Sequence, residues 1–382
     1  MSNTSSFHAI DDKSSTLVSR DLRGMVRRLT ILAVNGLASM FDRERHLFCL
    51  TLKQTEHGMV REGISRRYTM MALMGLRRLE EGGETSPVAI GPVVDRLLAN
   101  LDWIDNAGDL GVLLWLCALV APERLAEVER RTNITQVLPK YRQTRQGRTM
   151  ELALFLAGLS HAWLARKEMP SELQDVAIQT YRTLIKNQGE QGLFAHLASN
   201  GSASGMLRGN IGSFADQAFA IYAMTKFFQA YGDKAALERA LDCTLMICEA
   251  QGSLGQWWWH YDSSSGRVAG RFPVFSVHQH GLAPMALLEL GKTIQSDFTP
   301  WIQKGLQWIR VNELAFDMED VTANVVWRGM CRTLPTRVWS TAMALLAQRE
   351  DPASRHGLKI MFECHPCELG WLLYAFGSHV NA

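Results

Sequence analysis

The sequence lacks features that define several large classes of protein. Basic and acidic residues nearly cancel, 40 against 38 in 382 residues, so no net charge favours binding to nucleic acid or to an anionic membrane. Apolar runs such as 110–121 fall well short of the ~20 residues that a membrane-spanning helix needs. Glycine-rich phosphate loops, dinucleotide fingerprints, nucleophile elbows and His-Glu-x-x-His patterns are all absent. We therefore expect no nucleic-acid partner, no transmembrane segment and no cofactor.

A secreted disulfide framework is also missing. The seven cysteines are odd in number and lie mostly within apolar helical stretches, which is typical of reduced thiols in a core. The N-terminal stretch 1–19 is rich in Ser, Asn, Thr and Asp and has no continuous apolar segment, which predicts a disordered tail and not a signal peptide. These features favour a cytoplasmic protein.

What the sequence does have is helical periodicity, with almost no alternating strand pattern. Its hydrophobic content of 47% is enough for one large core. Short turns follow the predicted helices that end at 167, 231 and 292, whereas long segments rich in Gly, Ser and aromatic residues follow 188, 251 and 312. Because short turns join antiparallel neighbours, the sequence predicts an all-α protein built from helical hairpins.

A repeated motif supports this division into hairpins. Residues 188–194 read QGEQGLF and residues 251–257 read QGSLGQW, so both follow the pattern Gln-x3-Gly-x-aromatic. A degenerate third copy, 304–313, ends at Glu313 and lacks the downstream Gly-x-aromatic. We expect the Gln at the end of each outer helix to cap backbone groups of the next turn, while the aromatic residue packs on the neighbouring hairpin.

These residues resemble the QW motif of the squalene cyclase and prenyltransferase toroids. The resemblance covers about 174–313 and implies an α/α toroid (barrel), in which inner helices surround a central cavity and outer helices run antiparallel to them. Ring closure would bring the last helix beside the helix at 20–44, so we expect 20–382 to form a single α/α-toroid domain. The inner-type helices indicate six or seven helical hairpins, and they are expected at 64–79, 108–120, 147–167, 213–231, 276–292, 336–348 and 366–376.

In such a toroid every outer-to-inner loop emerges on one rim. We therefore expect the long loops 189–212, 252–275, 313–335 and 349–365 to converge over the N-terminal ends of the inner helices, with Arg337 near the entrance. Helix N-termini at this rim would favour an anionic or hydroxyl-rich ligand. The rim is the predicted active site.

The densest run of reactive side chains is 256–281. Asp262, His278 and His280 are predicted as acid/base candidates, together with Asp216 at the start of another inner helix. Aromatic faces would bind a sugar ring or line a polyprenyl site, and arginines would clamp an anion or a hydroxyl group. The predicted substrate-binding residues are Trp258, Trp259, Tyr261, Arg271, Trp327 and Arg328.

Purely structural roles are the alternative. Asp262 precedes three serines and could open a turn. Ser213 with Asp216, and Ser276 with Gln279, both match the capping box.

The same applies to the aromatic and basic groups. The aromatic residues of 257–261 could belong to the core, and Arg271 could pair with a nearby acid. His278 and His280 lie two apart on a helix and point to different sides, so only one of them is expected to line the cavity.

Three short motifs only partly match known functional patterns. Residues 364–367 read CHPC, but structural zinc needs four ligands, and we predict no metal site. Asp-Cys at 242–243 lacks the middle residue of the Asp-x-Cys zinc motif of protein prenyltransferases. The stretch 317–320 has the wrong spacing for the Asp-x-Asp-Asp motif of terpene cyclases.

The mixture of aromatic, acidic, imidazole and guanidinium groups also resembles carbohydrate-active toroids such as six-hairpin glycosidases, lyases and sugar 2-epimerases. Residues 255–290 and 363–376 look like bacterial proteins associated with exopolysaccharide production. The sequence thus predicts an enzyme of bacterial polysaccharide metabolism that acts on a saccharide or lipid-linked saccharide by Asp/His acid–base chemistry.

Two alternatives stay open at this point: a terpenoid cyclase-like enzyme with an isoprenoid substrate, and a non-catalytic glycan-binding or assembly protein. A deep aromatic chamber would favour the first and a filled centre the second, whereas an open polar groove would favour a glycan enzyme. Reaction type and oligomeric state are not fixed by the sequence.

Overall fold

The structure is a computed structural model that describes residues 12–104, 106–137, 148–166, 170–197, 209–333 and 357–379. Its first helix begins at Asp12, within the stretch expected to be a tail. The predicted helix 336–348 and Arg337 lie outside the described residues.

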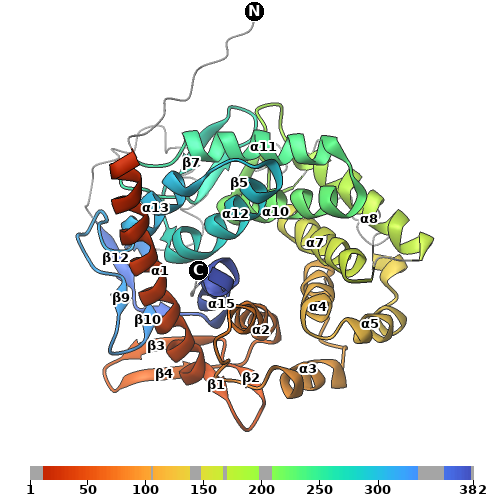
Figure 1. The fold of residues 1–382 in the computed structure, drawn as a ribbon, viewed down its shortest axis with the longest axis horizontal. Coiled ribbons are helices and arrows are strands. Elements are labelled where there is room, and N and C mark those ends of the chain that lie inside the picture. The colour runs from red at the N-terminus through yellow and green to blue at the C-terminus, as the bar shows by residue number, and fades with distance from the viewer. Residues whose placement is uncertain are drawn as a thin grey trace, which may run out of the picture.

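Helices alternate between an outer and an inner layer (Figure 1). The outer helices are α1 (Asp12–Met40), α3 (Ile90–Ala99), α5 (Leu125–Thr132), α8 (Ser171–Leu184), α11 (Lys234–Glu249) and α13 (Thr299–Trp308). The inner helices are α2 (Arg66–Glu81), α4 (Ala107–Val120), α7 (Thr149–Arg166), α10 (Phe214–Tyr231), α12 (Ala283–Ile294) and α15 (Pro366–Phe376). A π-helical turn, η4 (His278–Leu282), leads into α12.

Each inner helix packs on the next, and α15 packs on α2, so the inner helices close a ring. Glycine pairs bring two of these neighbours into close contact. A Cβ atom on Gly158 of α7 would lie 2.1 Å from the carbonyl oxygen of Gly111 on α4, and one on Gly75 of α2 would lie 2.2 Å from that of Gly370 on α15. The described residues thus form an α/α toroid with six inner helices. In this part of the chain, no helix is long and apolar enough to span a membrane.

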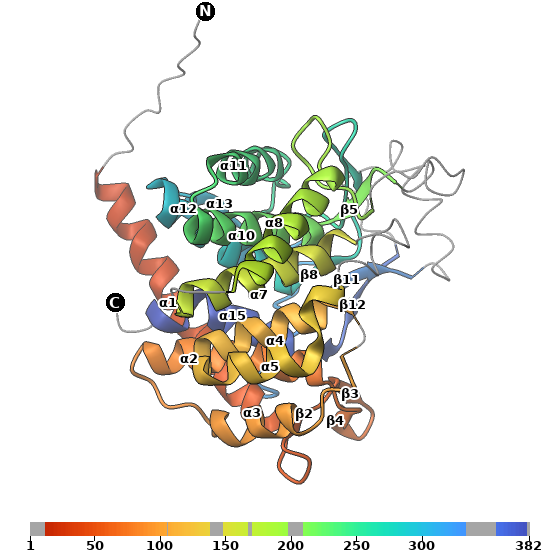
Figure 2. The ribbon, with the colours of Figure 1, turned by 90° about the vertical axis from the view of Figure 1, so that its right-hand side faces the viewer.

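Short strands, which the periodicity did not indicate, connect the outer-to-inner loops on one side of the helices (Figure 2). The loop after α8 supplies β5 (Ile211–Ser213), which pairs with β6 (His260–Asp262) from the loop after α11. β6 continues into β7 (Arg267–Gly270). Loops 189–212 and 252–275 therefore share a rim, as predicted.

Two further sheets extend the same rim. One joins β8 (Val274–Phe275), β11 (Gly329–Arg332) and β12 (Leu358–Met361). The other joins β3 (Thr51–Thr55), β4 (Gly58–Glu62) and β13 (Glu363–Cys364). Two smaller pairs are β1 (Phe41–Asp42) with β2 (Leu47–Phe48), and β9 (Glu319–Asp320) with β10 (Val325–Val326).

The repeated motif has the predicted capping role. The Gln188 side-chain amide donates to the carbonyl of Gly192 at 2.8 Å and to that of Arg239 on α11 at 3.1 Å. Gln251 donates in the same way to Gly255 at 3.2 Å and to Trp301 on α13 at 2.9 Å. Each Gln thereby ties its loop to the next outer helix.

The third copy differs. Glu313 accepts from the Gln256 amide at 3.0 Å and from the Trp308 indole at 2.8 Å. A carboxylate has no proton to donate to carbonyl groups, so Glu313 acts as an acceptor instead of a cap.

Candidate active site

The first turns of the inner helices carry polar side chains at the rim where the loops converge. Acidic residues occupy this position in α4, α7, α10 and α15, as Asp109, Glu151, Asp216 and Glu368. At a helix N-terminus an acidic side chain can accept hydrogen bonds from the free backbone N–H groups, and the helix dipole favours its negative charge.

Asp216 forms the best-connected part of this rim. Its fully buried carboxylate accepts hydrogen bonds from Ser213 N and Ser213 Oγ, both at 2.8 Å, and from Met150 N at 3.1 Å. Asp216 thus closes a capping box with Ser213 and links α10 to α7. Because Asp216 has no exposed surface, it can act on a ligand only through a neighbouring side chain.

That neighbour is His196, whose ring Nδ1 lies 3.2 Å from Asp216 Oδ2. Its backbone is held from both sides, since Thr149 N donates to His196 O and His196 N donates to Ile211 O. The His196 side chain is 44% exposed, so its ring faces the rim. The hydrogen bond to Asp216 raises the pKa of His196, against an opposing effect of burial.

Glu151 follows directly after Met150, which donates to Asp216, so it lies beside this pair. Its side chain is 15% exposed, and its Oε1 lies 3.6 Å from Arg148 Nη1. The charge of Glu151 also raises the pKa of His196, although less than Asp216 does. A half-exposed imidazole therefore lies near two carboxylates from adjacent inner helices.

Asp109 belongs to the next cluster around the ring. Asn106 caps α4 by accepting from Asp109 N at 2.9 Å. Arg67 of α2 donates through Nε to the Asp109 carboxylate and through Nη2 to Asn106 Oδ1 at 2.9 Å. The Arg67 charge is thus balanced at its own site.

His278 lies in the equivalent rim position of the α12 unit, but its surroundings are aromatic. Its ring stacks on Trp259 with centroids 5.9 Å apart and an angle of 7°, and it also packs on Phe214 and Phe275. Burial lowers its pKa to about 3. Burial also lowers the pKa of His280 to about 3, and neither ring nitrogen of His280 has a hydrogen-bond partner among the described residues.

Arg328 organises the rim around α15. Its Nη1 donates to the ring of His365 and lies 3.3 Å from Glu363, and its guanidinium lies over the Phe275 ring. Its Nε is 3.8 Å from Glu368. Glu363 and Glu368 therefore offset part of the Arg328 charge, and the role of Arg328 as an anion clamp stays a prediction.

Glu368 is fully buried in the same cluster, where its Oε2 accepts from His365 N at 3.0 Å. Burial raises the pKa of Glu368 to about 7, an effect opposed by Arg328. Burial lowers the pKa of His365 to about 3. The ring centroids of His365 and Tyr68 are 5.3 Å apart, so this cluster also contacts α2.

Asp262 takes the turn role that was the structural alternative. Its Oδ1 accepts from the N and Oγ of Ser264, at 2.9 and 2.6 Å, and its Oδ2 accepts from Ser265 Oγ at 2.8 Å. Both carboxylate oxygens are therefore engaged within the β6–β7 turn, which does not support acid/base work at Asp262.

Several predicted binding residues belong to the core. Tyr261 has no exposed surface and Trp327 is 2% exposed, so neither offers a face to a ligand. Trp258 is 8% exposed and lies beneath the guanidinium of Arg271, at 5.5 Å. Of the predicted aromatic residues, Trp259 is the one that is partly exposed at the rim.

The capping-box prediction is wrong for Gln279. Its Oε1 accepts from Trp257 N at 3.2 Å and its Nε2 donates to Phe275 O at 3.2 Å. Gln217 makes the same contacts in the preceding unit, accepting from Phe194 N at 2.7 Å and donating to Ser213 O at 3.2 Å. Both glutamines hold the aromatic residue of the repeat against an inner helix.

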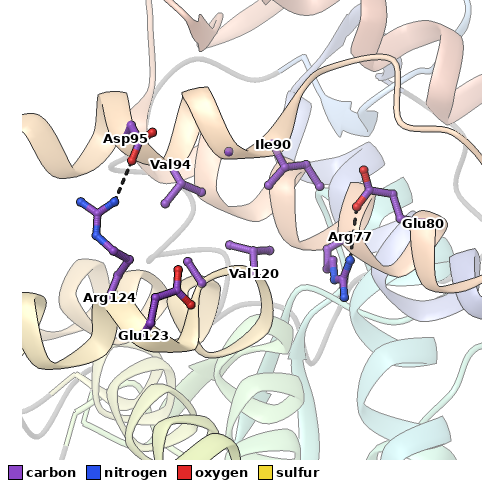
Figure 3. A pocket seen from close by; sticks show the side chains of 10 residues that line it. Arg77, Glu80, Ile90, Val94, Asp95, Val120, Glu123 and Arg124 are labelled. Carbon is purple, nitrogen blue, oxygen red and sulfur yellow. Dashed lines mark hydrogen bonds and ion pairs between the residues drawn. The ribbon is translucent and has the colours of Figure 1, made fainter.

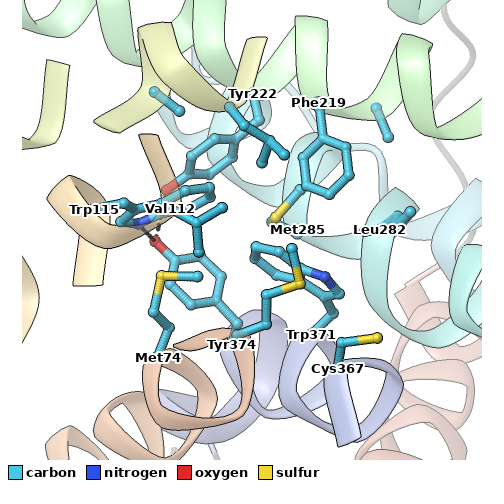
Figure 4. Close-up of a cluster of buried hydrophobic side chains, with 14 of the residues drawn as sticks. Met74, Val112, Trp115, Phe219, Tyr222, Leu282, Met285, Cys367, Trp371 and Tyr374 are labelled. Carbon is cyan, nitrogen blue, oxygen red and sulfur yellow. Dashed lines mark hydrogen bonds between the residues drawn. The ribbon is translucent and has the colours of Figure 1, made fainter. Parts of the chain in front are cut away.

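Below the rim the centre of the ring is filled (Figure 4). We call this group the aromatic plug; it consists of Trp115, Phe219, Tyr222, Trp371 and Tyr374, all less than 8% exposed. Among the described residues these five side chains occupy the centre of the ring, an arrangement that does not favour the terpenoid alternative.

Two surface pockets lie away from the rim. One of about 470 Å³ is found where α2 and α4 end, with Arg77–Glu80 and Arg124–Asp95 ion pairs at its two ends (Figure 3). The other, of about 650 Å³, lies between α1 and α13. Within the described ranges no three His, Cys, Asp or Glu side chains group closely enough to hold a metal ion, and this includes 364–367.

His196 and Glu151 were not among the predicted site residues, although the repeat contains a signal for the first. His196 follows Phe194 by two residues, as Trp259 follows Trp257. Asp216 precedes Gln217 as His278 precedes Gln279. Aligning the two units places His196 at the position of Trp259 and Asp216 at the position of His278, and the structure shows that both pairs are in contact.

Comparison with known proteins identifies solved structures with a similar fold. No family model matches the chain, and no curated protein does either. A solved unsaturated glucuronyl hydrolase specific for heparin is similar, with a TM-score of 0.59 and 16% identity over 92% of this chain and 96% of that one. This similarity confirms the α/α toroid.

Two further solved structures agree. A possible member of the GH105 family from Salmonella enterica has a TM-score of 0.60 and 10% identity, covering 99% of this chain and 96% of its own. An unsaturated glucuronyl hydrolase from Streptococcus agalactiae has a TM-score of 0.55 and 11% identity, covering 94% and 91%. The resemblance to squalene cyclases stays an expectation from the sequence alone.

Proposed function

We propose that this protein is a carbohydrate-active enzyme whose acid/base group is His196, with Glu151 as the second functional carboxylate. The observation that carries the proposal is the half-exposed His196 ring, held by buried Asp216 beside Glu151 at the rim. A carboxylate that fixes an imidazole and raises its pKa prepares it to exchange a proton near neutral pH.

The roles divide according to burial. Asp216 has no exposed surface and acts as a positioning residue, which orients the ring through Nδ1. Nε2 of His196 is then free to transfer a proton to or from a substrate or a water. Glu151, with its partly exposed side chain, is suited to activate water or to stabilise positive charge that develops on a sugar ring.

The substrate class is a saccharide. Several of the similar structures are unsaturated glucuronyl hydrolases, and a mutant of the one from Streptococcus agalactiae was solved in complex with dGlcA-GalNAc6S. Trp259 is partly exposed on the same rim and stacks on the buried ring of His278, so Trp259 supplies an aromatic face of the kind that sugars bind. Lipid-linked saccharides, a bacterial polysaccharide pathway and a cytoplasmic location stay predictions.

Activity on unsaturated uronyl disaccharides tests the proposal, because cleavage removes the ultraviolet absorbance of their conjugated double bond. Disaccharides from lyase-digested heparin and chondroitin should be compared with saturated glycosides. Hydrolysis of the saturated glycosides is followed by the reducing sugar that it releases. His196→Gln and Glu151→Gln should abolish turnover without changing the melting temperature by more than a few degrees. Exposed Glu172→Gln on the outer helix α8 is the matched control.

The Asp262→Asn variant separates this site from the one expected from sequence. Full activity is expected, with a small loss of stability from the turn. If Asp262→Asn stays folded and loses all turnover while His196→Gln stays active, the proposed site is wrong and the earlier candidate is restored.

A non-catalytic glycan-binding or assembly role is the second candidate, and the filled centre favours it. Glycan binding by the wild type, measured by calorimetry, together with no turnover of any saccharide, would support that role.

A further inference from the structure

Side chains from five inner helices meet in one hydrogen-bonded chain inside the ring. Tyr374 of α15 accepts from the Trp115 indole of α4 at 3.1 Å and from Arg78 Nη2 of α2 at 3.4 Å. Its hydroxyl lies 2.6 Å from that of Tyr222 on α10, which lies 2.9 Å from Nε2 of His161 on α7. We call this the hydroxyl chain; part of it is visible in Figure 4.

The donors at one end determine the direction of every bond in the chain. Trp115 Nε1 and Arg78 Nη2 can only donate, so both lone pairs of the Tyr374 oxygen are occupied. The Tyr374 proton must then point to Tyr222. Tyr222 in turn has its own proton left for Nε2 of His161, which must be an acceptor.

We propose that Trp115 and Arg78 fix the direction of the hydroxyl chain, so that His161 is held as the neutral tautomer protonated on Nδ1, and that the chain is an acid-sensitive lock on the ring of inner helices. The proposal concerns the interior below the rim and does not depend on the proposed function.

Protonation of His161 would break the chain. If Nε2 of His161 carried a proton, it would have to donate that proton to the Tyr222 oxygen, so Tyr222 could no longer donate its own proton to His161. The Tyr222 proton would then point to the Tyr374 oxygen, which already accepts two hydrogen bonds. At least one buried hydrogen bond would be lost, and an unmatched buried donor is costly.

The surrounding charges oppose protonation as well. The charges that act on His161 are those of Arg78 on α2 and Lys226 on α10. Glu289 of α12 is bound to Lys226 at 2.7 Å, whereas α4 and α15 present uncharged Trp115 and Tyr374. The helices α8 and Pro122–Arg124 also pack on α7. Burial, followed by these two cations, lowers the pKa of His161 well below its usual value.

The sign of the resulting pH effect follows from linkage. Below about pH 6.5 the unfolded chain binds a proton at this residue and the folded chain does not, so stability is lost as pH falls from that value. Above about pH 6.5 the hydroxyl chain contributes its full stabilisation to the folded state.

Nitrogen NMR of the full chain with labelled histidine tests the tautomer directly. We expect His161 to show a protonated Nδ1 and an unprotonated Nε2 at neutral pH, with no titration near its usual pKa of about 6.5. A protonated Nε2, or titration near that value, would overturn the proposal. The His161→Gln variant assigns the signals, and Tyr222→Phe provides a second assignment if that variant does not fold.

Variants of the two tyrosines test the direction. Tyr374→Phe removes the acceptor that orders the chain, so some His161 protonated on Nε2 should appear. Tyr231→Phe is the control, because the Tyr231 hydroxyl has no partner among the described residues and its ring packs on Phe227 outside the chain. An unchanged His161 spectrum in Tyr374→Phe would contradict the assigned direction.

Urea unfolding tests the lock. From pH 7.5 to 5.5 the wild type should lose stability more steeply than His161→Gln, and the slopes should differ by up to one proton. The exposed His57→Gln variant should keep the wild-type slope. Equal slopes in the wild type and His161→Gln would refute the lock.

Discussion

The α8–α10 unit and the α11–α12 unit have the same frame but different rims. In both units a Gln caps the outer helix, a glycine with positive φ turns the loop, and a buried aromatic residue is held by a Gln of the inner helix. At the rim, however, the first unit carries His196 with Asp216 and the second carries Trp259 stacked on His278.

The difference shows that frame and site are separable in this fold. The repeated contacts between hairpins use backbone atoms and a few glutamines, and these contacts are the same in both units although the rim residues differ. One unit carries an imidazole held by a carboxylate, and its neighbour carries a stacked Trp–His pair.

The largest expected difference between the units is in catalysis. Asp216→Asn should lower turnover by about 10³-fold, because the ring of His196 loses its orienting carboxylate, equivalent to about 4 kcal/mol of barrier. His278→Gln should cost less than about 10-fold, because buried His278 only supports the ring of Trp259. Steady-state kinetics on the unsaturated disaccharides measures both, and the pH profile should shift in Asp216→Asn alone.

Circular dichroism and melting temperature serve as controls for both variants. Equal losses of turnover in two well-folded proteins would contradict the division of roles between the units.

The turn glycines should differ next. A Cβ atom on Gly255, where φ is 99°, would lie 1.9 Å from the carbonyl oxygen of Lys304, whereas one on Gly192 would lie 3.1 Å from Asp242 Cβ. Gly192→Ala should cost about 1–2 kcal/mol from its positive φ, and Gly255→Ala should cost more than about 3 kcal/mol because backbone must move as well.

Urea midpoints at unchanged m-values would give both costs. A Gly255→Ala variant as stable as Gly192→Ala would show that the second turn can shift away from α13.

The capping glutamines should behave almost alike. Gln188→Ala and Gln251→Ala each remove a donor from two carbonyl groups, at a cost of about 1–3 kcal/mol. Gln188→Ala should lower the free energy of unfolding slightly more than Gln251→Ala, since the Gln188 Oε1 also accepts a hydrogen bond from Arg239 at 2.9 Å.

Gln251→Glu sharpens this test, because it keeps the shape but places a carboxylate against two carbonyl oxygens. It should be less stable than Gln251→Ala in the same unfolding assay. The reverse order would mean that the contact depends on packing and not on donation.

Most of the fold could be predicted from the sequence, for identifiable reasons. Apolar residues recur at helical spacing, and turn lengths separate outer-to-inner from inner-to-outer connections. The Gln-x3-Gly-x-aromatic repeat then fixed the phase of the hairpins. The short rim strands were not predicted, because strands of two to five residues are too short to show alternation.

The site was predicted less well. The sequence analysis selected the most crowded segment, yet burial removed Tyr261 and Trp327 from the surface and a serine turn engaged Asp262. Contacts between segments distant in sequence, such as His196 with Asp216, became visible only when β5 brought the loop back to α10.

The units should also differ in the way their stability responds to pH. The pKa of His196 is raised by Asp216, so His196 stabilises the folded state below about pH 6.5 and loses this effect as pH rises through its folded pKa. Burial lowers the pKa of His278 to about 3, so His278 costs stability as pH falls below about 6.5.

The advantage of the wild type over His196→Gln should therefore grow as pH falls from 8 to 5.5, and its advantage over His278→Gln should shrink. Since the His196 side chain is 44% exposed, solvent screening keeps its slope the shallower of the two. Urea unfolding of both variants beside His57→Gln gives the slopes, and His57→Gln should stay parallel to the wild type. If the stability difference from the wild type changes with pH in the same direction for His196→Gln and His278→Gln, then the Asp216 carboxylate does not stabilise a protonated His196. The two rims would then not differ in their electrostatics.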